Sequence, residues 1–359
     1  MLKKTKPIIS VLAIAAVLFA FAACTQNNSA TLSPSPSSPA SPSGAPSTSS
    51  AAPSEDELWK KEAAYGTTIT VGYDGGVCTS PVVMANILGY YKEEGIEVTV
   101  VGMGNNTAEA IGTGKVTVGT DHIAYLMVPC VNGVDIIFTT ASQVGCKSLY
   151  VLKDSGIEKT SDLKGKNVAI PAGYGSFDHN IALRFFQKDG IGTNEVNYKV
   201  VESGAAILAM QNGEIDGAIL SDQYSYNFVK DGTLKYVRSL TWDEDFSKDV
   251  CCVVAFSKTF YEKNPITTLK MTRAVLKAKN WINANPAEAA KVMLDNNITS
   301  GDADIIADLI SAYNFAITDQ QCEVTLRSII KDYKIFGLIE DSADTEEIMK
   351  NLWHPLLQG

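Results

Sequence analysis

The segment "NVAIPAGYGSFDHNIALRFF", residues 167–186, decides the fold class. An apolar run at its start leads into a turn that contains two glycines, and a helical pattern follows Ser176. A strand, a glycine turn and a helix in this order are typical of α/β domains with parallel strands. In such domains ligands bind beyond the carboxyl ends of the strands, so this turn is also a candidate ligand site.

The same alternation extends to both sides of this segment. Short β-branched runs predict strands at 68–73, 96–101, 116–120, 135–141, 148–153, 197–202, 216–221, 234–240 and 250–257. Helical patterns lie between them, including one over 79–95 that starts with Ser80 and Pro81 and ends at Gly95. After the last strand the pattern is almost wholly helical. We therefore expect an α/β protein with two lobes, each a mainly parallel sheet flanked by helices, and a helical C-terminal part.

The N-terminus has the pattern of an export signal. Three lysines precede an apolar stretch that ends in small residues before Cys24. Residues 1–23 are therefore predicted to be a signal peptide, and "FAAC" resembles a bacterial lipobox, which implies lipidation of Cys24. The alternative is an ordinary cleaved secretion signal, in which Cys24 is not lipidated. The apolar stretch is short for a membrane-spanning helix, which needs about 20 apolar residues.

A Ser/Pro/Ala-rich segment, 24–66, follows the signal and contains six of the 13 prolines. Such a composition buries too little apolar surface to fold, so it predicts an extended tether. We divide the remaining chain into a first lobe (67–150), a second lobe (151–249) and a return to the first lobe with the C-terminal helices (250–359).

The composition limits the function. A net charge of −10, without a basic cluster, argues against nucleic-acid binding. Six cysteines follow Cys24 at irregular spacings, with no CxxC pair, and we expect them to be buried thiols, although a disulfide is compatible with export. The glycine turn lacks the Gly-Lys-Ser/Thr of a phosphate-binding P-loop.

Five segments in order, between Thr68 and Asn351, resemble one protein family. They are "GYYKEEGIEVTVV" (89–101), "AEAIGTGKVTVGTDH" (108–122), "TSDLKGKNVAIPAGYGSFDH" (160–179), "AILAMQNGEIDGAIL" (206–220) and "NWINANPAEAAKVM" (280–293). The chain is similar to the solute-binding lipoproteins of ABC importers in the nitrate/sulfonate/taurine/bicarbonate group, whose fold is shared with thiamin-pyrimidine-binding (NMT1-like) proteins. The resemblance implies a periplasmic-binding-protein type II fold.

The resemblance also implies a function. Two lobes would close on a small organic molecule, with an anion such as a sulfonate among the candidates, and deliver it to an ABC permease with its ATPase. We expect the protein to be a monomer on the extracytoplasmic side of a bacterial membrane. We also expect that it is not an enzyme and needs no cofactor. The open alternatives are an enzyme of the same fold, such as a pyrimidine synthase, and a solute sensor for a receptor.

The polar and sulfur-bearing residues of this chain concentrate in the loops expected at the cleft. The candidate ligand-binding residues are Asp74, Cys78, Asp121, His122, Cys146, Gly175, Ser176, His179, Asp222, Tyr224 and Cys252. No catalytic residue is predicted.

Several of these assignments have a structural alternative. Ser176 reads as a helix N-cap, and its turn either contacts the ligand, as the resemblance implies for Gly175 and His179, or only starts the helix. Asp121 is equally well explained as a cap. Asp222, like Asp74, disfavours a bare anion because like charges repel. The cysteines and histidines could bind a soft metal, but they lie on separate loops, so we predict core thiols and no metal site.

Overall fold

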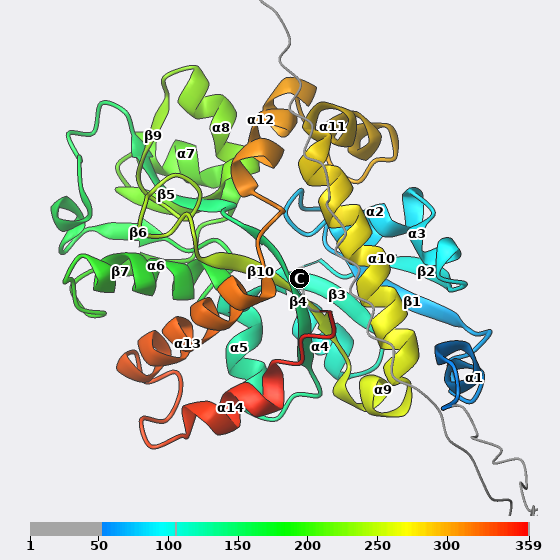
Figure 1. The fold of residues 1–359 in the computed structure, drawn as a ribbon. Helices are drawn as coiled ribbons and strands as arrows, with labels where there is room; N and C mark the ends of the chain where they lie inside the picture. The colour runs from blue at the N-terminus through cyan, green and yellow to red at the C-terminus, as the bar shows by residue number, and fades with distance from the viewer. Residues whose placement is uncertain (1–51, 105, 358–359) are drawn as a thin grey trace, which may run out of the picture. The chain divides into compact units, whose positions relative to one another are not determined.

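The computed structural model describes residues 52–104 and 106–357, and these contain two five-stranded sheets (Figure 1). The expected signal peptide and Cys24 lie outside the described residues. The first sheet has the strand order β2-β1-β3-β10-β4. Its strands are β1 (Thr68–Tyr73), β2 (Glu97–Gly102), β3 (Val118–His122), β4 (Ile137–Val144) and β10 (Val250–Phe256).

The second sheet has the order β7-β6-β8-β5-β9. Its strands are β5 (Lys147–Leu152), β6 (Asn167–Ala169), β7 (Asn197–Lys199), β8 (Gly217–Ser221) and β9 (Leu234–Ser239). In each sheet four strands share one direction and one strand opposes them, namely β10 in the first and β5 in the second. Both opposing strands are those that arrive from the other sheet. The expectation of two mainly parallel sheets is confirmed.

Helices cover both sheets. In the first lobe they are α2 (Pro81–Ile87), α3 (Tyr90–Glu93), α4 (Thr107–Gly112) and α5 (Ile123–Val131), and in the second η1 (Thr160–Leu163), α6 (Phe177–Lys188), α7 (Ser203–Gln211) and α8 (Asp222–Lys230). The single helix expected over 79–95 is interrupted because Gly89 adopts a left-handed conformation, with φ of 79°. Ser80 occupies the N-cap of α2, but its side chain makes no capping hydrogen bond.

The last third of the described chain is helical, as expected. It contains α9 (Lys258–Lys263), α10 (Pro265–Ala284), α11 (Pro286–Asp295), α12 (Ala303–Tyr313), α13 (Asp319–Ile335) and α14 (Thr345–Leu352). Helix α10 packs against α2 and α3, and α13 packs against β4 and β10, so both belong to the first lobe. Helix α12 instead contacts α8 of the second lobe. No helix in the described part of the chain combines the length and apolar character needed to cross a membrane.

Two features differ from the expected boundaries. Residues 55–59, placed in the tether, form helix α1 (Glu55–Trp59), because Ser54 and Glu57 make a capping box. The indole of Trp59 then donates a hydrogen bond to Thr267 of α10 at 3.0 Å. The first crossing between the sheets lies at Gly145–Cys146, between β4 and β5, a few residues before the expected position.

An arginine joins the two lobes. The second crossing between the sheets is the segment 240–249, between β9 and β10. Arg184 of α6 is almost fully buried and donates to Asp249, in this crossing, and to Asp332 of α13, both at 2.9 Å. Because the guanidinium is always charged, its burial depends on these carboxylates. We expect Arg184→Met to lower the free energy of unfolding by about 2 kcal/mol, a value below the usual cost of breaking a buried pair because water reaches both carboxylates. Urea denaturation measures the difference.

Arg327 provides the matched control, since it also lies between two carboxylates, those of Glu323 and Glu346, but on the exposed face of α13. Exposed ion pairs contribute about 1 kcal/mol or less, so Arg327→Met should have the smaller effect. Equal losses in the two variants would show that the Arg184 contacts add nothing beyond a surface pair.

Candidate functional site

A cavity of about 500 Å³ lies between the two lobes. The loop that follows β1 and the last residue of β3, His122, form one side, and the first parts of α6 and α8 form the other. Its lining consists of Asp74, Gly75, Gly76, Cys78, His122, Cys146, Lys147, Phe177, Ser221, Gln223, Tyr224, Asn227, Phe228, Ser300 and Gly301. The position agrees with the rule that ligands bind at the carboxyl ends of strands in open α/β sheets.

Contacts across the cavity hold the lobes together around it. The amide oxygen of Gln223, in α8, accepts a hydrogen bond from the backbone N–H of Val77 at 3.1 Å, and its amide nitrogen donates to Thr299. The ring of Phe177, the first residue of α6, stacks on His122 of β3 with the centroids 4.7 Å apart. The second lobe therefore contacts the first through residues of both α8 and α6.

A cluster of sulfur and nitrogen atoms forms the inner end of the cavity. The donor atoms of Cys78, His122, Cys146 and Cys252 all lie within 4.8 Å of one another. The sheet register explains part of this convergence, because β10 pairs with β3 and places Cys252 opposite His122. Cys146 enters from the first crossing, and the loop after β1 carries Cys78.

The imidazole of His122 lies between a carboxylate and a thiol. Its Nδ1 is 2.8 Å from Asp121 Oδ1, and its Nε2 is 3.1 Å from Cys146 Sγ. Burial opposes protonation, but the Cys252 thiolate form and the Asp121 carboxylate outweigh it and raise the pKa of His122 to about 8. Burial also raises the pKa of Cys252 well above its ordinary value, so this thiol is neutral at neutral pH. Asp121 is therefore the group that stabilises protonated His122 there.

The surroundings of the four cysteines raise their thiol pKa values and so favour the neutral form. Burial raises the pKa of Cys146 to about 11 and raises that of Cys251, whose sulfur is 3.3 Å from Cys146 Sγ. A buried neutral thiol is a poor nucleophile. The cluster as it stands is therefore suited to holding a group and not to attacking one.

The charged groups beside the cavity are largely compensated. Lys147 makes an ion pair with Asp178 at 2.8 Å, and its ammonium lies 4.5 Å from the centre of the Phe177 ring. Asp74 accepts hydrogen bonds from its own loop, from Gly76 N–H at 3.0 Å and from Thr79. Burial and the nearby Asp121 raise the pKa of Asp74. The cavity thus offers polar contacts without an unpaired cation aimed at an anion.

The structure places the predicted site residues in three groups. Asp74, Cys78, His122, Cys146 and Tyr224 line the cavity. Cys252 is fully buried and lies with the cysteines and His122, whereas Asp121 supports His122 from behind. Gly175, Ser176, His179 and Asp222 are not among the residues that line this cavity.

The turn at 173–176 is displaced from the cavity. His179 lines a different hollow with Tyr174 and Tyr198, and its Nδ1 accepts a hydrogen bond from Gly175 N–H at 3.3 Å. Helical geometry explains the difference, because His179 follows Phe177 by two residues and points about 200° away from it. Ser176 is the N-cap of α6, but its hydroxyl donates to Gly173 O at 2.6 Å instead of capping.

Asp222 is a structural residue. Its carboxylate is fully buried and accepts hydrogen bonds from the hydroxyls of Ser148 at 2.7 Å, Tyr150 at 2.6 Å and Thr241. These partners lie on β5 and in the second crossing. The carboxylate therefore joins the start of α8 to the segments that connect the lobes, and it does not line the cavity.

Sequence reasoning missed several lining residues. Lys147 directly follows the candidate residue Cys146, and Phe177 directly follows Ser176. Neither was selected, because no sequence motif marks a lysine in an ion pair or a stacked aromatic ring. Ser300 and Gly301 come from the loop between α11 and α12, within the part read only as helical. Their signal was the Ser-Gly-Asp turn in which Asp302 caps α12.

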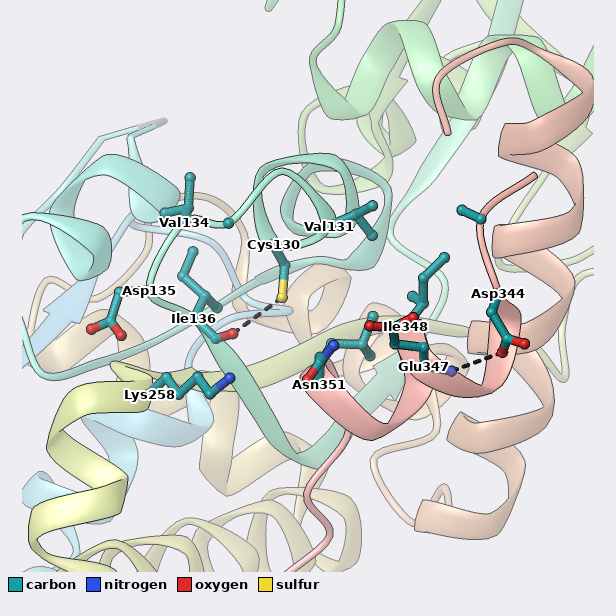
Figure 2. A pocket seen from close by; sticks show the side chains of 13 residues that line it. Cys130, Val131, Val134, Asp135, Ile136, Lys258, Asp344, Glu347, Ile348 and Asn351 are labelled. Atoms are coloured by element: carbon teal, nitrogen blue, oxygen red, sulfur yellow. Dashed lines mark hydrogen bonds between the residues drawn. The ribbon is translucent and has the colours of Figure 1, made fainter. Parts of the chain in front are cut away.

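Figure 2 shows another cavity, of about 440 Å³, on the first lobe between the end of α5, Lys258 and helix α14. Cys130 donates a hydrogen bond to Ile136 O at 3.1 Å at its edge. None of the described residues selected from the sequence lines it. Asp344 there caps α14 through the N–H groups of Glu346 and Glu347, which assigns that carboxylate to the fold.

Two sheets joined by two crossings, with a cavity between them, define a two-lobed α/β fold. The chain belongs to the NMT1/THI5-like family: the family model described as "NMT1/THI5 like" matches residues 78–289, more than half of the chain. The family expected from the sequence is thereby confirmed.

Relatives within and around this family carry different functions in their names. The taurine-binding periplasmic protein of Escherichia coli is 27% identical over 226 residues, which cover 62% of this chain and 69% of that protein. The 4-amino-5-hydroxymethyl-2-methylpyrimidine phosphate synthase THI11 of Saccharomyces cerevisiae is 24% identical over 234 residues, 60% of this chain. The aligned part spans 66% of that synthase, slightly less than two thirds of its length.

Solved structures share the whole fold. The alkanesulfonate-binding protein SsuA from Xanthomonas axonopodis pv. citri, bound to MOPS, superposes with a TM-score of 0.65 at 16% identity. The superposition covers 82% of this chain and 99% of that one. This likeness confirms the type II periplasmic-binding-protein fold.

Proposed function

We propose that this chain is the substrate-binding lipoprotein of an ABC importer, held on the extracytoplasmic side of a bacterial membrane through Cys24. It captures a small organic solute between its lobes and delivers it to the permease as a monomer. The observation that carries the proposal is the 500 Å³ cavity whose lining is shared by both lobes. A ligand that contacts both sides stabilises the closed form by its differential affinity for it.

The lining indicates the kind of solute. Phe177 and Phe228 offer apolar faces, and Tyr224, Asn227 and Ser300 offer neutral hydrogen-bonding groups. Asp74 is the acidic group at the rim, whereas Lys147 is already paired. This combination favours an organic solute with a hydrogen-bond donor, such as an aminoalkyl sulfonate or an aminopyrimidine, over a bare inorganic anion.

The test is a thermal-shift screen with taurine, other sulfonates, nitrate, bicarbonate and aminopyrimidines, followed by calorimetry of each compound that binds. A true solute at about 100 times its Kd should add about 2.7 kcal/mol to the stability of the protein. We expect Tyr224→Ala to raise the Kd at least about tenfold, a loss of about 1.4 kcal/mol. His179→Ala, outside the cavity, is the matched control and should bind as the wild type does.

An enzyme of the pyrimidine synthase type is the second candidate, favoured by the names of the curated relatives. The same experiment separates the two functions when the bound compound is recovered and its mass determined. Release of the unchanged compound supports capture, whereas a converted product overturns it.

A further inference from the structure

We propose that Cys78, His122, Cys146 and Cys252 form a binding site for a soft transition-metal ion of the Zn²⁺ type at the inner end of the interlobe cavity. This reverses the expectation of core thiols. The inference deepens the proposed function, because the ion would lie at the floor of the cavity that receives the solute.

The first argument is the geometry of the four donor atoms. Zn–S bonds of about 2.3 Å and a Zn–N bond of about 2.0 Å place tetrahedral ligands roughly 3.5–3.8 Å apart. The donor atoms of the four residues lie within 4.8 Å of one another, and the shortest recorded contact, between His122 Nε2 and Cys146 Sγ, is 3.1 Å. These separations bracket the tetrahedral edges, so adjustment of side chains suffices to bind an ion.

The second argument is the orientation of His122. In the neutral imidazole, Asp121 Oδ1 accepts from Nδ1–H at 2.8 Å, which leaves the Nε2 lone pair on the side of Cys146 Sγ. An ion bound there replaces the proton that Nε2 carries in the imidazolium form. Asp121 is itself buried, with 1% of its surface exposed, and also accepts from the backbone N–H of His122 at 2.7 Å. A carboxylate that fixes the outer nitrogen of a histidine is the usual support of a metal ligand.

The third argument is the backbone of Cys146. Its φ is 106°, a left-handed value that non-glycine residues rarely adopt. The conformation is held by a hydrogen bond from its N–H to Thr241 Oγ1 at 2.9 Å. Such strain is retained where the surroundings need the side chain at one place, and here it directs the sulfur to His122.

The choice of metal follows from the donors. Three sulfurs and one imidazole nitrogen suit Zn²⁺ and other soft ions, whereas Mg²⁺ and Ca²⁺ require oxygen ligands. Cys78, His122 and Cys146 line the cavity, and Cys252 lies below them without exposure. An ion held there is reached from the cavity, and a solute in the cavity can lie against it.

The experiment uses the full chain, reduced and freed of metal by a chelator. Co²⁺ is added first, because a cobalt–thiolate site gives intense near-ultraviolet charge-transfer bands and strong visible bands when tetrahedral. Zn²⁺ should then displace Co²⁺ and abolish the spectrum, with a single ion per chain by elemental analysis. We expect Cys146→Ser and Cys252→Ser to weaken binding at least about 100-fold and Asp121→Asn about 10- to 100-fold.

Controls come from the other cysteines. Cys251→Ser is adjacent to Cys252 in the sequence but outside the ligand set, and Cys322→Ser lies in α13; both should retain the cobalt spectrum. Circular dichroism of the metal-free variants verifies that each is folded. Three results would overturn the proposal. They are an unchanged cobalt spectrum in Cys252→Ser, loss of cobalt binding in Cys322→Ser equal to that in Cys252→Ser, and a Cys146–Cys251 disulfide that persists with no ion bound.

The outcomes also separate this inference from the proposed function. Cobalt and zinc binding without any solute bound would support the metal site and count against solute capture. Solute binding by protein that takes up neither ion would support capture and refute the metal site.

Discussion

Replacing Asp222 by alanine is expected to lower the free energy of unfolding by about 3 kcal/mol. The change removes an acceptor of three hydroxyls. Those of Tyr150 and Thr241 lose their acceptor, whereas Ser148 can still donate to Ser239 Oγ at 2.8 Å. An unsatisfied buried donor costs about 1–3 kcal/mol, and partial rearrangement among the hydroxyls keeps the sum below the maximum. Urea denaturation with two spectroscopic probes measures the loss.

Asp222→Asn is the conservative control, because it keeps the volume and one acceptor oxygen. Burial raises the pKa of Asp222 above its ordinary value of 3.8, so the fold disfavours the charged form. The contribution of this carboxyl to stability is therefore greatest below the unfolded pKa and declines as the pH rises towards the raised folded pKa. The stability of the wild type relative to Asp222→Asn should fall over that range. A loss below about 0.5 kcal/mol in Asp222→Ala would contradict the structural role.

The alternation of strands and helices was sufficient to predict the architecture. It depends on local patterns, and short parallel strands with intervening helices leave few arrangements. The position of the cleft followed from the same rule, which is why five selected residues line the cavity. The boundary of the tether was misjudged because a five-residue helix, α1, is recognisable only by its capping box.

Individual side chains were harder to place. Phe177 lines the cavity and His179 does not because the two side chains point in different directions around the axis of α6. The sequence does not determine which face of α6 borders the cavity. Asp222 looks like a ligand residue until its hydroxyl partners, up to 74 residues distant in sequence, are known. The sulfur cluster depends on the pairing of β10 with β3, which joins residues 130 positions apart, such as Cys252 and His122. Local sequence patterns do not predict which distant strands pair in this way.

The largest effect of a minimal substitution is expected at Gly145, where the chain crosses from the first sheet to the second. Its φ is 79°, and a Cβ added there would lie 2.7 Å from Thr241 Oγ1 and 3.2 Å from Thr241 Cα. Thr241 belongs to the second crossing, so the two connections between the lobes touch at this glycine. Gly145→Ala should cost about 3 kcal/mol, of which about 1–2 kcal/mol is the left-handed conformation and the rest overpacking.

Gly114→Ala isolates the conformational part of that loss. Gly114 has a φ of 73° in the turn between α4 and β3, and nothing lies within 4 Å of its added Cβ. It should therefore lose only about 1 kcal/mol in the same denaturation series. Losses that match between the two variants would show that the crossings tolerate a methyl group between them. A larger loss at Gly145 that diminishes in the Thr241→Ala background would locate the excess at the contact between the crossings. That contact is where Thr241 also holds Cys146, so the joint between the lobes and the inner end of the cavity are built from the same residues.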